Sequence, residues 1–311
     1  MEFFSHQTSY PFMATRKVWY ALSAILMIVS LGSFLSRGLN LAIDFTGGVS
    51  AEVSFPHAVN VDEVRGKLTA AAFREPQVQN FGSSRDIAIR MPPDAKLTAT
   101  EVRARLETAL KSIDPAAQVV QLDVVGPQVG SELKTSALYA LFFTLAGIFV
   151  YIAIRFHTWR LSLGAILAVT HDPILVIGFF SLTQMSFDLA VVAAILAVIG
   201  YSLNDTVVVF DRIRERFETN RRSPPAVVLD QSINQTLSRT IMTKVVTSIV
   251  VVALLFLGGP VLRGFSAALL IGIIAGTYSS IYIASAIALD CGLTAEHVFP
   301  TVKKEAFDNL P

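Results

Sequence analysis

The sequence predicts a polytopic α-helical membrane protein with six transmembrane helices and one α+β domain, of ferredoxin-like βαββαβ order, inserted between the first two helices. Three observations predict this class. Hydrophobic residues make up 53% of the 311-residue chain and charged residues only 16%, against about 25% charged in soluble domains. Six apolar runs approach the ~20 residues that a helix needs to cross a bilayer. One long segment between the first two runs shows instead the short patterns of a soluble domain.

The apolar runs define the predicted spans, which are Val18–Leu35, Ser136–Ile154, Leu161–Leu182, Leu189–Phe210, about Thr240–Leu257 and Phe265–Leu289. The first run is longer than the core of a signal peptide and lacks a small-residue cleavage site, so we expect an uncleaved anchor. The predicted organisation is then a terminal segment (1–17), a first helix (18–36), the inserted domain (37–134), a five-helix bundle (135–290) with a polar loop at 211–239, and a tail (291–311).

The placement of Lys and Arg in the short connections predicts the orientation. Basic residues gather before the first span, in the second and fourth connections and in the tail: Arg16, Lys17, Arg155, Arg160, Arg212, Arg214, Arg216, Arg221, Arg222, Lys303 and Lys304. The loop Gln184–Asp188 has none, and Gly258–Gly264 has only Arg263. Because basic short loops stay in the cytoplasm, both termini are expected there and the inserted domain outside. The stretch Asp211–Arg216 is interpreted as such an anchor, with a cytoplasmic docking surface as the alternative.

The inserted domain is predicted from alternation and capping patterns. Strands are expected at Val49–Phe55, Gln77–Ser83, Ile87–Met91 and Val120–Val124, where apolar residues alternate with polar ones. Asn60 with Glu63, and Thr98 with Glu101, have the spacing of helix caps ahead of two apolar helical faces. The resulting order β-α-β-β-α-β is that of a ferredoxin-like unit.

Several kinds of chemistry have no motif in this chain. It contains no phosphate-binding G-x-x-x-x-G-K-[ST] run, no H-E-x-x-H, no G-x-S-x-G and no C-x-x-C. The single cysteine, Cys291, excludes an internal disulfide framework, and the five histidines lack ligand spacing. We therefore expect no ATPase activity, no metal and no cofactor, and the net charge of +1 indicates no nucleic-acid partner. Any work performed would draw on the membrane potential or a proton gradient.

Charged residues inside the apolar spans are the candidate functional residues, because each costs about 2.5–3.5 kcal/mol to insert. The fourth span contains Asn204 and Asp205, and Arg239 precedes the fifth. At 1.5 Å per residue, Asp205 lies roughly 25 Å and Arg239 roughly 28 Å from the outer face. The sequence therefore predicts that they pair, so that protonation of the carboxylate breaks the pair and acts as a proton-coupled switch. The alternative is that both lie among lipid headgroups and end their helices.

The third span carries His171 and Asp172 before Pro173, near the bilayer centre. One interpretation is a proton relay. The other is structural: Asp172 satisfies backbone groups that the proline frees, and His171 hydrogen-bonds Asp172 or a neighbouring helix. Both remain open at this point.

The sixth span has a packing signal. Small residues recur at every fourth position, namely Gly264, Ala268, Gly272, Gly276, Ser280, Ala284 and Ala288. Such a face lets another helix approach closely, and the partner is either internal or in another subunit.

Several ordered motifs resemble those of the SecF family of the bacterial Sec protein-export machinery, in the SecD/SecF group of the resistance–nodulation–division superfamily. The motifs are Asn40–Gly48, Val125–Gly130, His171-Asp172, Ile199–Arg214, Gln235–Thr240, Gly258–Pro260 and Gly264-Phe265. The Asp44–Gly48 stretch is interpreted as a turn that needs glycine, and not as a phosphate loop. By position, Asp205 matches an acidic residue and Arg239 an arginine of the family's proton path, while Asp172 matches a position less firmly tied to it.

The resemblance implies a function and a set of partners. It implies a multi-pass subunit of the bacterial inner membrane that uses proton flow to assist late-stage preprotein translocation. The implied partners are a SecD-like subunit, the SecYEG channel, the translocating preprotein and protons, with YajC as a further candidate. Two rivals are a half of a proton-driven exporter of small molecules or lipids, and a non-catalytic scaffold of the export channel.

Overall fold

The computed structural model describes residues 8–81, 83–93, 97–156 and 158–299. The described chain forms two compact units: a membrane unit, which has the described residues up to 40 and from 141 onward, and an inserted unit, which has the described residues of 41–140. Two residues named in the sequence analysis, Lys303 and Lys304, lie outside the described residues, as does most of the predicted tail.

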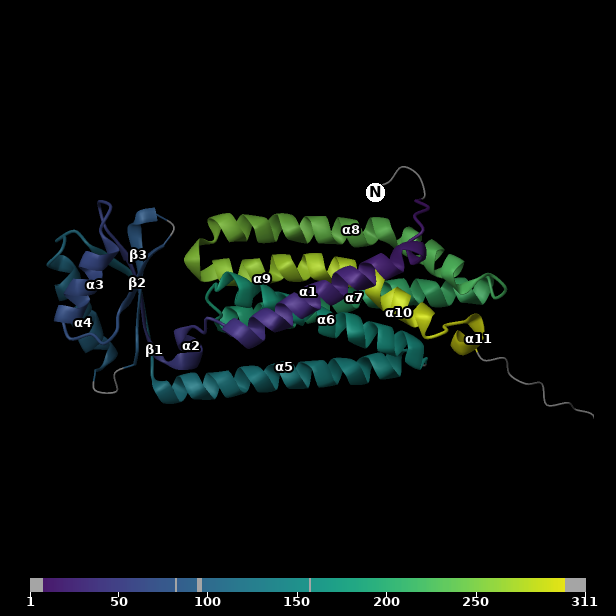
Figure 1. Cartoon of the computed structure of the whole chain (residues 1–311), viewed down its shortest axis with the longest axis horizontal. Helices are drawn as coiled ribbons and strands as arrows, with labels where there is room; N and C mark the ends of the chain where they lie inside the picture. Colours follow the sequence, from purple (N-terminus) through teal and green to yellow (C-terminus); the bar gives the residue numbers. More distant parts are fainter. Residues whose placement is uncertain (1–7, 82, 94–96, 157, 300–311) are drawn as a thin grey trace, which may run out of the picture. The chain divides into compact units, whose positions relative to one another are not determined.

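Six helical segments of the described chain are long and apolar enough to cross a bilayer. The first consists of the short η1 (Met13–Thr15) followed by α1 (Arg16–Arg37). The next four are α5 (Pro127–Arg155), α6 (Trp159–Thr183), α7 (Leu189–Thr219) and α8 (Pro225–Leu257). The sixth contains α9 (Gly259–Tyr278), the π-helical η2 (Ser279–Ala284) and α10 (Ser285–Asp290). Figure 1 shows α8 and α9 side by side along their length. A last short helix is α11 (Ala295–Val298).

The predicted polar loop 211–239 is mostly helical. Helix α7 continues to Thr219, and α8 already begins at Pro225, where a proline at the first helical position costs no hydrogen bond. Buried apolar side chains explain the extension, because Phe217 near the end of α7 and Val228 and Ile233 in the first turns of α8 are almost completely inaccessible. Only residues 220–224 connect the two helices.

Glycines allow the membrane helices to approach closely. A Cβ atom at Gly178 of α6 would lie 2.1 Å from the Ser30 hydroxyl of α1, and one at Gly272 of α9 would lie 2.2 Å from Val198 of α7. Gly264 and Gly276 also face α7, whereas Gly164 of α6 lies against the backbone of Ala284 in η2. The small-residue face of the sixth span therefore contacts two neighbours, α7 before the π-helix and α6 within it.

The described part of the N-terminal segment is tied to α8 and η2. The backbone amide of Met13 donates to Asp230 Oδ1 (2.8 Å), and the side-chain amide of Asn234 exchanges hydrogen bonds with the backbone of Tyr10. The ring of Phe12 packs edge-on against Tyr282, with centroids 5.4 Å apart.

The inserted unit contains a four-stranded antiparallel sheet. Its elements in chain order are α2 (Ile43–Thr46), β1 (Gly48–Ser54), α3 (Val61–Ala70), β2 (Gln77–Phe81), β3 (Ser83–Met91), α4 (Ala99–Lys111) and β4 (Gln118–Val125), and the first turns of α5 complete it. The strand order is β2-β3-β1-β4, with Val49 of β1 opposite Met91 on one side and Val124 on the other. Helices α3 and α4 contribute Val64, Leu68 and Leu106 to its core.

The two helices of the inserted unit are capped largely as the sequence predicts. Thr98 accepts a hydrogen bond from the Glu101 amide while the Glu101 carboxylate accepts one from the Thr98 amide, which is a complete capping box. The carboxylate is stabilised by these donors, and this holds the pKa of Glu101 below its ordinary value. The side chain of Asn60 caps α3 through the amide of Asp62, and not through that of Glu63.

The paired glycines after α2 occupy a turn that other residues would strain. Gly47 and Gly48 have φ values of +70° and +129°, which L side chains rarely adopt. A Cβ atom at Gly48 would lie 2.5 Å from the Met91 carbonyl oxygen, and one at Gly130 would lie 2.7 Å from the Gly47 nitrogen. The two glycine motifs of the sequence therefore pack directly against each other.

Candidate functional site

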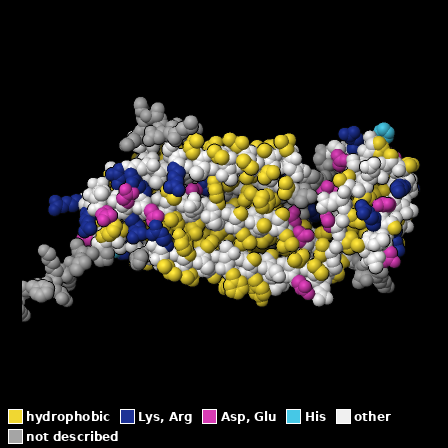
Figure 2. Space-filling model, turned by 180° about the vertical axis from the view of Figure 1, so that it is seen from behind, with side chains coloured by type: hydrophobic (Ala, Val, Ile, Leu, Met, Phe, Trp, Pro, Cys, Tyr) yellow, Lys and Arg dark blue, Asp and Glu magenta, His cyan; other side chains and the backbone are white. Residues whose placement is uncertain are grey.

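Buried polar side chains in the middle of the membrane unit form the candidate site. Figure 2 shows hydrophobic side chains over the middle of this unit, with Lys and Arg gathered at one end. The buried polar side chains inside it include a group from α6, α7, α8 and the sixth span: His171, Asp172, Ser202, Asp205, Lys244 and Ser279. Polar groups that are buried among apolar helices must find partners, so their contacts define the site.

Asp172 of α6 joins three helical elements. Its side chain is completely inaccessible. Oδ2 accepts hydrogen bonds from the hydroxyl of Ser202 on α7 (2.5 Å) and from that of Ser279 in η2 (2.9 Å), while Oδ1 lies 3.0 Å from His171 Nδ1. The sequence left open whether Asp172 serves the backbone around Pro173. In the structure its carboxylate is engaged instead by side chains, two of them from other helices.

The sixth span reaches Asp172 because of two local features. Gly276 has no side chain, and a Cβ atom there would lie 3.0 Å from Ser202 and 3.3 Å from Asp172 Oδ2. The π-helical turn that begins at Ser279 then follows. Such turns are rare and occur frequently at functional sites. Together they bring the Ser279 hydroxyl to the carboxylate.

His171 has one ring nitrogen engaged and the other free. Nδ1 faces Asp172, whereas Nε2 is buried without a hydrogen-bond partner among the described residues. Its ring centroid lies 5.6 Å from that of Tyr278, whose hydroxyl donates to the Trp19 carbonyl oxygen (3.0 Å). One ring nitrogen of this buried imidazole is therefore engaged by Asp172, and the other faces no hydrogen-bonding group among the described residues.

Asp205 of α7 forms an ion pair with Lys244 of α8. Asp205 Oδ2 and Lys244 Nζ are 2.6 Å apart, and the two residues are only 6% and 5% exposed. Neither atom has a hydrogen bond to any other described residue. The Lys244 ammonium also lies over the ring of Tyr201, 3.9 Å from its centroid.

The partner of Asp205 is not the predicted one. Arg239 is exposed, and within the described ranges it makes no ion pair; its charge acts on Asp205 only from a greater distance. Helical geometry explains the difference, because residues 239 and 244 point about 140° apart around the helix axis. Sequence reasoning compared depths along the axis and missed Lys244, although this lysine is the only charged residue between Thr240 and Leu257.

Asn204 is not part of this cluster. Its side chain is exposed, whereas its neighbours Leu203 and Asp205 are buried. The predicted group of five residues therefore separates: His171, Asp172 and Asp205 lie in the interior, and Asn204 and Arg239 lie at the surface of the membrane unit. Lys244, Ser202, Ser279 and Tyr201 are the additions that the structure makes.

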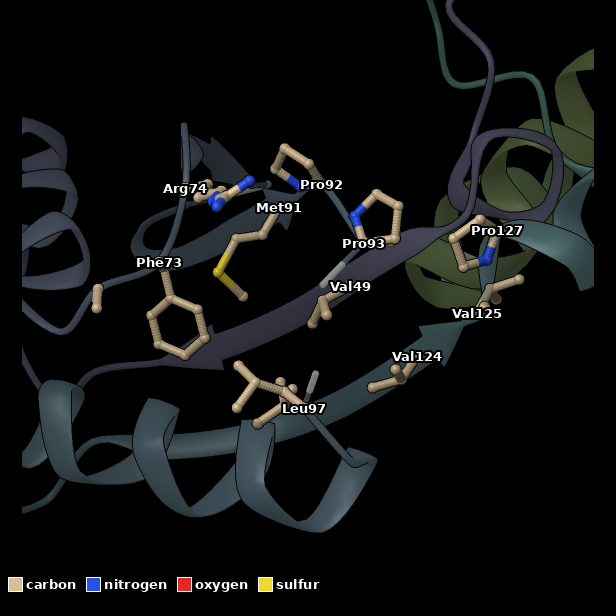
Figure 3. A pocket seen from close by; sticks show the side chains of 14 residues that line it. Val49, Phe73, Arg74, Met91, Pro92, Pro93, Leu97, Val124, Val125 and Pro127 are labelled. Carbon is tan, nitrogen blue, oxygen red and sulfur yellow. The ribbon is translucent and has the colours of Figure 1, made fainter. Parts of the chain in front are cut away.

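The inserted unit has a pocket of a different character. It has a volume of about 340 Å³ and lies between the sheet, the 72–74 turn and the start of α5. Figure 3 shows Phe73, Met91, Leu97 and Val124 around it, with Arg74 as the one charged side chain among those labelled. No carboxylate or histidine is among its described lining residues.

The described residues hold no group of three or more His, Cys, Asp or Glu side chains that would bind a metal ion. The arrangement in the membrane unit combines two carboxylates, an imidazole, an ammonium and two serine hydroxyls. Side chains of these types are chemically capable of exchanging protons and of forming ion pairs, and charges are costly in such an apolar medium.

Comparisons with known proteins cover nearly the whole chain. Residues 105–294 match the family model described as "Protein export membrane protein SecD/SecF, C-terminal", and residues 32–55 match the model "SecD/SecF GG Motif". The first range contains Asp172, Asp205 and Lys244, and the second contains the Gly47-Gly48 turn.

Characterised relatives and solved structures agree with these models. The chain is 45% identical to the protein translocase subunit SecF of Haemophilus influenzae and 43% identical to that of Pseudomonas aeruginosa; each match covers 96% of this chain, and 91% and 97% of the relative. It is also similar to the crystal structure of SecDF, a translocon-associated membrane protein from Thermus thermophilus, with a TM-score of 0.82 and 38% identity. That match covers 91% of this chain and 39% of the SecDF chain.

Proposed function

The chain belongs to the SecF family of protein translocase subunits, and from this premise we propose that it uses the proton motive force to assist late-stage preprotein translocation through the SecYEG channel. The observation that carries the proposal is the buried Asp205–Lys244 ion pair (2.6 Å) inside six apolar helices. A carboxylate in this environment is expensive to keep charged, so its protonation changes the forces between α7 and α8.

The proposed complex contains this subunit and a SecD-like partner. The chain spans 39% of the similar SecDF chain, which leaves room there for a second set of helices. We further propose contacts with SecYEG and the preprotein, and with YajC. Purification from native membranes tests these assignments, because a SecD-like subunit and the channel are expected to be recovered with this chain.

The proposed location is the bacterial inner membrane, with both termini in the cytoplasm. Arg212, Arg214 and Arg216 lie in the last turns of α7, and Arg221 and Arg222 lie in the connection to α8. The positive-inside tendency predicts that this end faces the cytoplasm. The inserted unit would then lie in the periplasm. Its βαββαβ element order is that of a ferredoxin-like unit, and this order, together with the strand order β2-β3-β1-β4, supports the proposal that the inserted unit is a ferredoxin-like domain.

The proposed mechanism is a switch at Asp205. When the carboxylate is ionised it attracts Lys244 and holds α7 against α8; when it takes up a proton that attraction is lost and the helices are free to shift. Asp172 and His171 form a second protonatable cluster, which connects α6 and η2 to the same helix α7 through Ser202. Arg239 is proposed to act from the surface, as a cation near the entrance to the path. Movement of these helices would displace the inserted unit and pull on the preprotein.

The test replaces Asp205 by asparagine and measures proton-gradient-dependent export. Asp205→Asn is expected to reduce the gradient-dependent component to background, because the amide neither takes up nor releases a proton. Asp211→Asn is the matched control: it lies on the same helix, but its side chain is 41% exposed and pairs with Arg155. If Asp205→Asn exports and conducts protons like the unmodified protein, the switch is wrong, and retained export after neutralising both Asp205 and Arg239 would favour a scaffold role.

A further inference from the structure

Strand β4 forms an open edge of the sheet in the inserted unit. It is the last strand in the order β2-β3-β1-β4, and its regular pairing with β1 covers residues 121–125, up to a register shift at Val120. Within the described chain, these five residues make no backbone hydrogen bond to any element except β1. The N–H and C=O groups on their other side therefore point outward, in the arrangement that accepts an added strand.

The opposite edge of the sheet, β2, is less available to a further strand. It is five residues long and follows Pro76, which has no backbone N–H. The Val78 carbonyl oxygen accepts a hydrogen bond from the Arg65 guanidinium of α3 (3.4 Å). Prolines and covering elements of this kind protect edge strands from pairing. β4 contains no proline, and its one charged residue is Asp123.

The apolar pocket of the inserted unit lies beside the open edge. Val124 of β4 lines it together with Phe73, Met91 and Leu97 (Figure 3). Val124 is paired with the buried Val49 of β1, yet 38% of Val124 remains exposed. Side chains opposite each other on paired strands lie about 4.5–5.5 Å apart. A residue that is opposite Val124 on an added strand would therefore direct its side chain to the pocket.

The size and charge of the pocket determine which side chain it accepts. Its volume is about 340 Å³, and an apolar cavity of about 150 Å³ already holds a benzene ring. A leucine or phenylalanine side chain therefore fits. Arg74 is the one charged residue among the described lining residues, and it is exposed. A lysine side chain is disfavoured there, because it would lose water in an apolar pocket next to a like charge.

We propose that β4 binds an extended, unfolded polypeptide segment by strand addition, with residues 121–125 supplying backbone hydrogen bonds and the pocket accepting one large apolar side chain. Backbone hydrogen bonds do not depend on the sequence of the bound segment, and one apolar anchor is common in unfolded chains. Folded proteins keep most of their backbone groups paired internally, so an unfolded chain is the partner that this edge fits. Its identification with the translocating preprotein rests on the proposed function.

Peptide binding to the full-length protein in detergent tests this proposal. The probe is a short fluorescent peptide of serine and threonine with one central phenylalanine, and binding is measured by fluorescence anisotropy. The same peptide with methylated backbone nitrogens donates no hydrogen bonds, and it is expected to bind about tenfold more weakly or worse. Replacement of the phenylalanine by lysine is expected to weaken binding to a similar extent, because the anchor is lost.

One variant of the protein tests the edge and the pocket together. Val124→Lys places a charge on the pocket side of β4, which is a means by which natural edge strands avoid pairing, and it is expected to weaken binding by about tenfold or more. Gln79→Lys is the matched control, because it adds the same charge at an exposed position of β2, and it is expected to bind the peptide as the unmodified protein does. Asp205→Asn is likewise expected to bind normally.

Amide hydrogen exchange locates the bound peptide without any variant. The peptide is expected to slow exchange within residues 121–125 and to leave β2 unchanged. Slower exchange in β2 alone, or equal binding of the methylated peptide, would overturn the proposal. Protection of residues 121–125 in a purified complex with a SecD-like subunit, before peptide is added, would also overturn it and assign this edge to the subunit interface.

These failures are distinguishable from a failure of the proposed function. If peptide binding is absent but Asp205→Asn still abolishes gradient-dependent export, the role of β4 is wrong and the proposed function stands. If Asp205→Asn retains gradient-dependent export while the peptide binds to β4, the proposed function is wrong and the strand-addition site stands.

Discussion

The two units differ in the side chains that their interiors bury. The core of the inserted unit is entirely apolar among the buried residues described, from Val49 on β1 to Ala117 before β4. The interior of the membrane unit instead buries two carboxylates, an ammonium and an imidazole. An apolar core resists change of shape, whereas buried ion pairs change their energy when one proton is gained. The membrane unit therefore buries groups whose charge a proton would change, as the proposed function requires, whereas the described core of the inserted unit buries none.

The largest expected effect tests whether the buried polar network stabilises the membrane unit. Asp172→Ala removes the acceptor of Ser202 and the partner of His171 Nδ1, at about 1–3 kcal/mol for each, and leaves Ser279 only its longer hydrogen bond to the Gly276 carbonyl oxygen, so we expect a loss of at least about 2 kcal/mol. Thermal unfolding of the purified protein in detergent measures it. Asp123→Ala removes an exposed carboxylate of the inserted unit and is expected to change the free energy of unfolding by no more than about 0.5 kcal/mol. Equal losses in the two variants would show that the buried polar network does not stabilise the membrane unit.

Close helix packing gives the next effect. Gly272→Ala places a methyl group 2.2 Å from Val198, and overpacking of this kind costs about 1–3 kcal/mol. Gly200→Ala is the matched control on the opposing helix, because nothing lies within 4 Å of its Cβ position, and it is expected to be neutral or slightly stabilising. A neutral result for Gly272→Ala would show that α7 and α9 are less closely packed than the structure indicates.

The capping box in the inserted unit predicts a smaller, local effect. Thr98→Ala removes the cap of α4 at a cost of about 1 kcal/mol, seen as faster amide hydrogen exchange in the first turn of that helix. The pKa of Glu101 is lowered in the folded state, so its contribution is present above the ordinary value of 4.5 and is lost as the pH falls below it. Thr108→Ala, in the last turn of α4, is the control and should leave exchange in the first turn unchanged.

The smallest effect is expected at Glu52, a half-buried carboxylate on β1 of the sheet. Burial, and then the negative charge of Asp123 on the next strand, raise the pKa of Glu52. The raised value means that ionised Glu52 disfavours the folded state, so its penalty appears as the pH rises through that pKa. Glu52→Gln is therefore expected to stabilise the inserted unit slightly at pH 7, with a gain that disappears below pH 4.5. The exposed Glu63→Gln should show no such pH-dependent gain.

Much of the fold could be predicted because periodicity and caps are local. The apolar runs located all six spans, and the Thr98–Glu101 spacing located a helix start that the structure contains. The short helix Ile43–Thr46, interpreted from the sequence as part of a turn, and the helical continuation through 211–239 depend on burial against other elements, which a local pattern does not contain.

In the candidate site, too, the sequence predicts which carboxylates are buried but not which side chains they contact. Burial of Asp172 and Asp205 could be predicted, because a carboxylate in an apolar span must avoid lipid. The counterion could not be chosen correctly from depth alone, since Arg239 and Lys244 differ mainly in direction around the α8 axis. Ser279 was likewise hidden, because a π-helical turn changes which residues share a face.

The most direct test of the central claim is proton movement through the reconstituted complex, measured in vesicles under an imposed proton gradient for the unmodified protein and for Asp205→Asn at equal protein content. We predict gradient-driven proton movement in the unmodified complex and its loss in Asp205→Asn, while Asp211→Asn behaves as the unmodified protein does. Proton movement at the unmodified rate in Asp205→Asn would contradict the account.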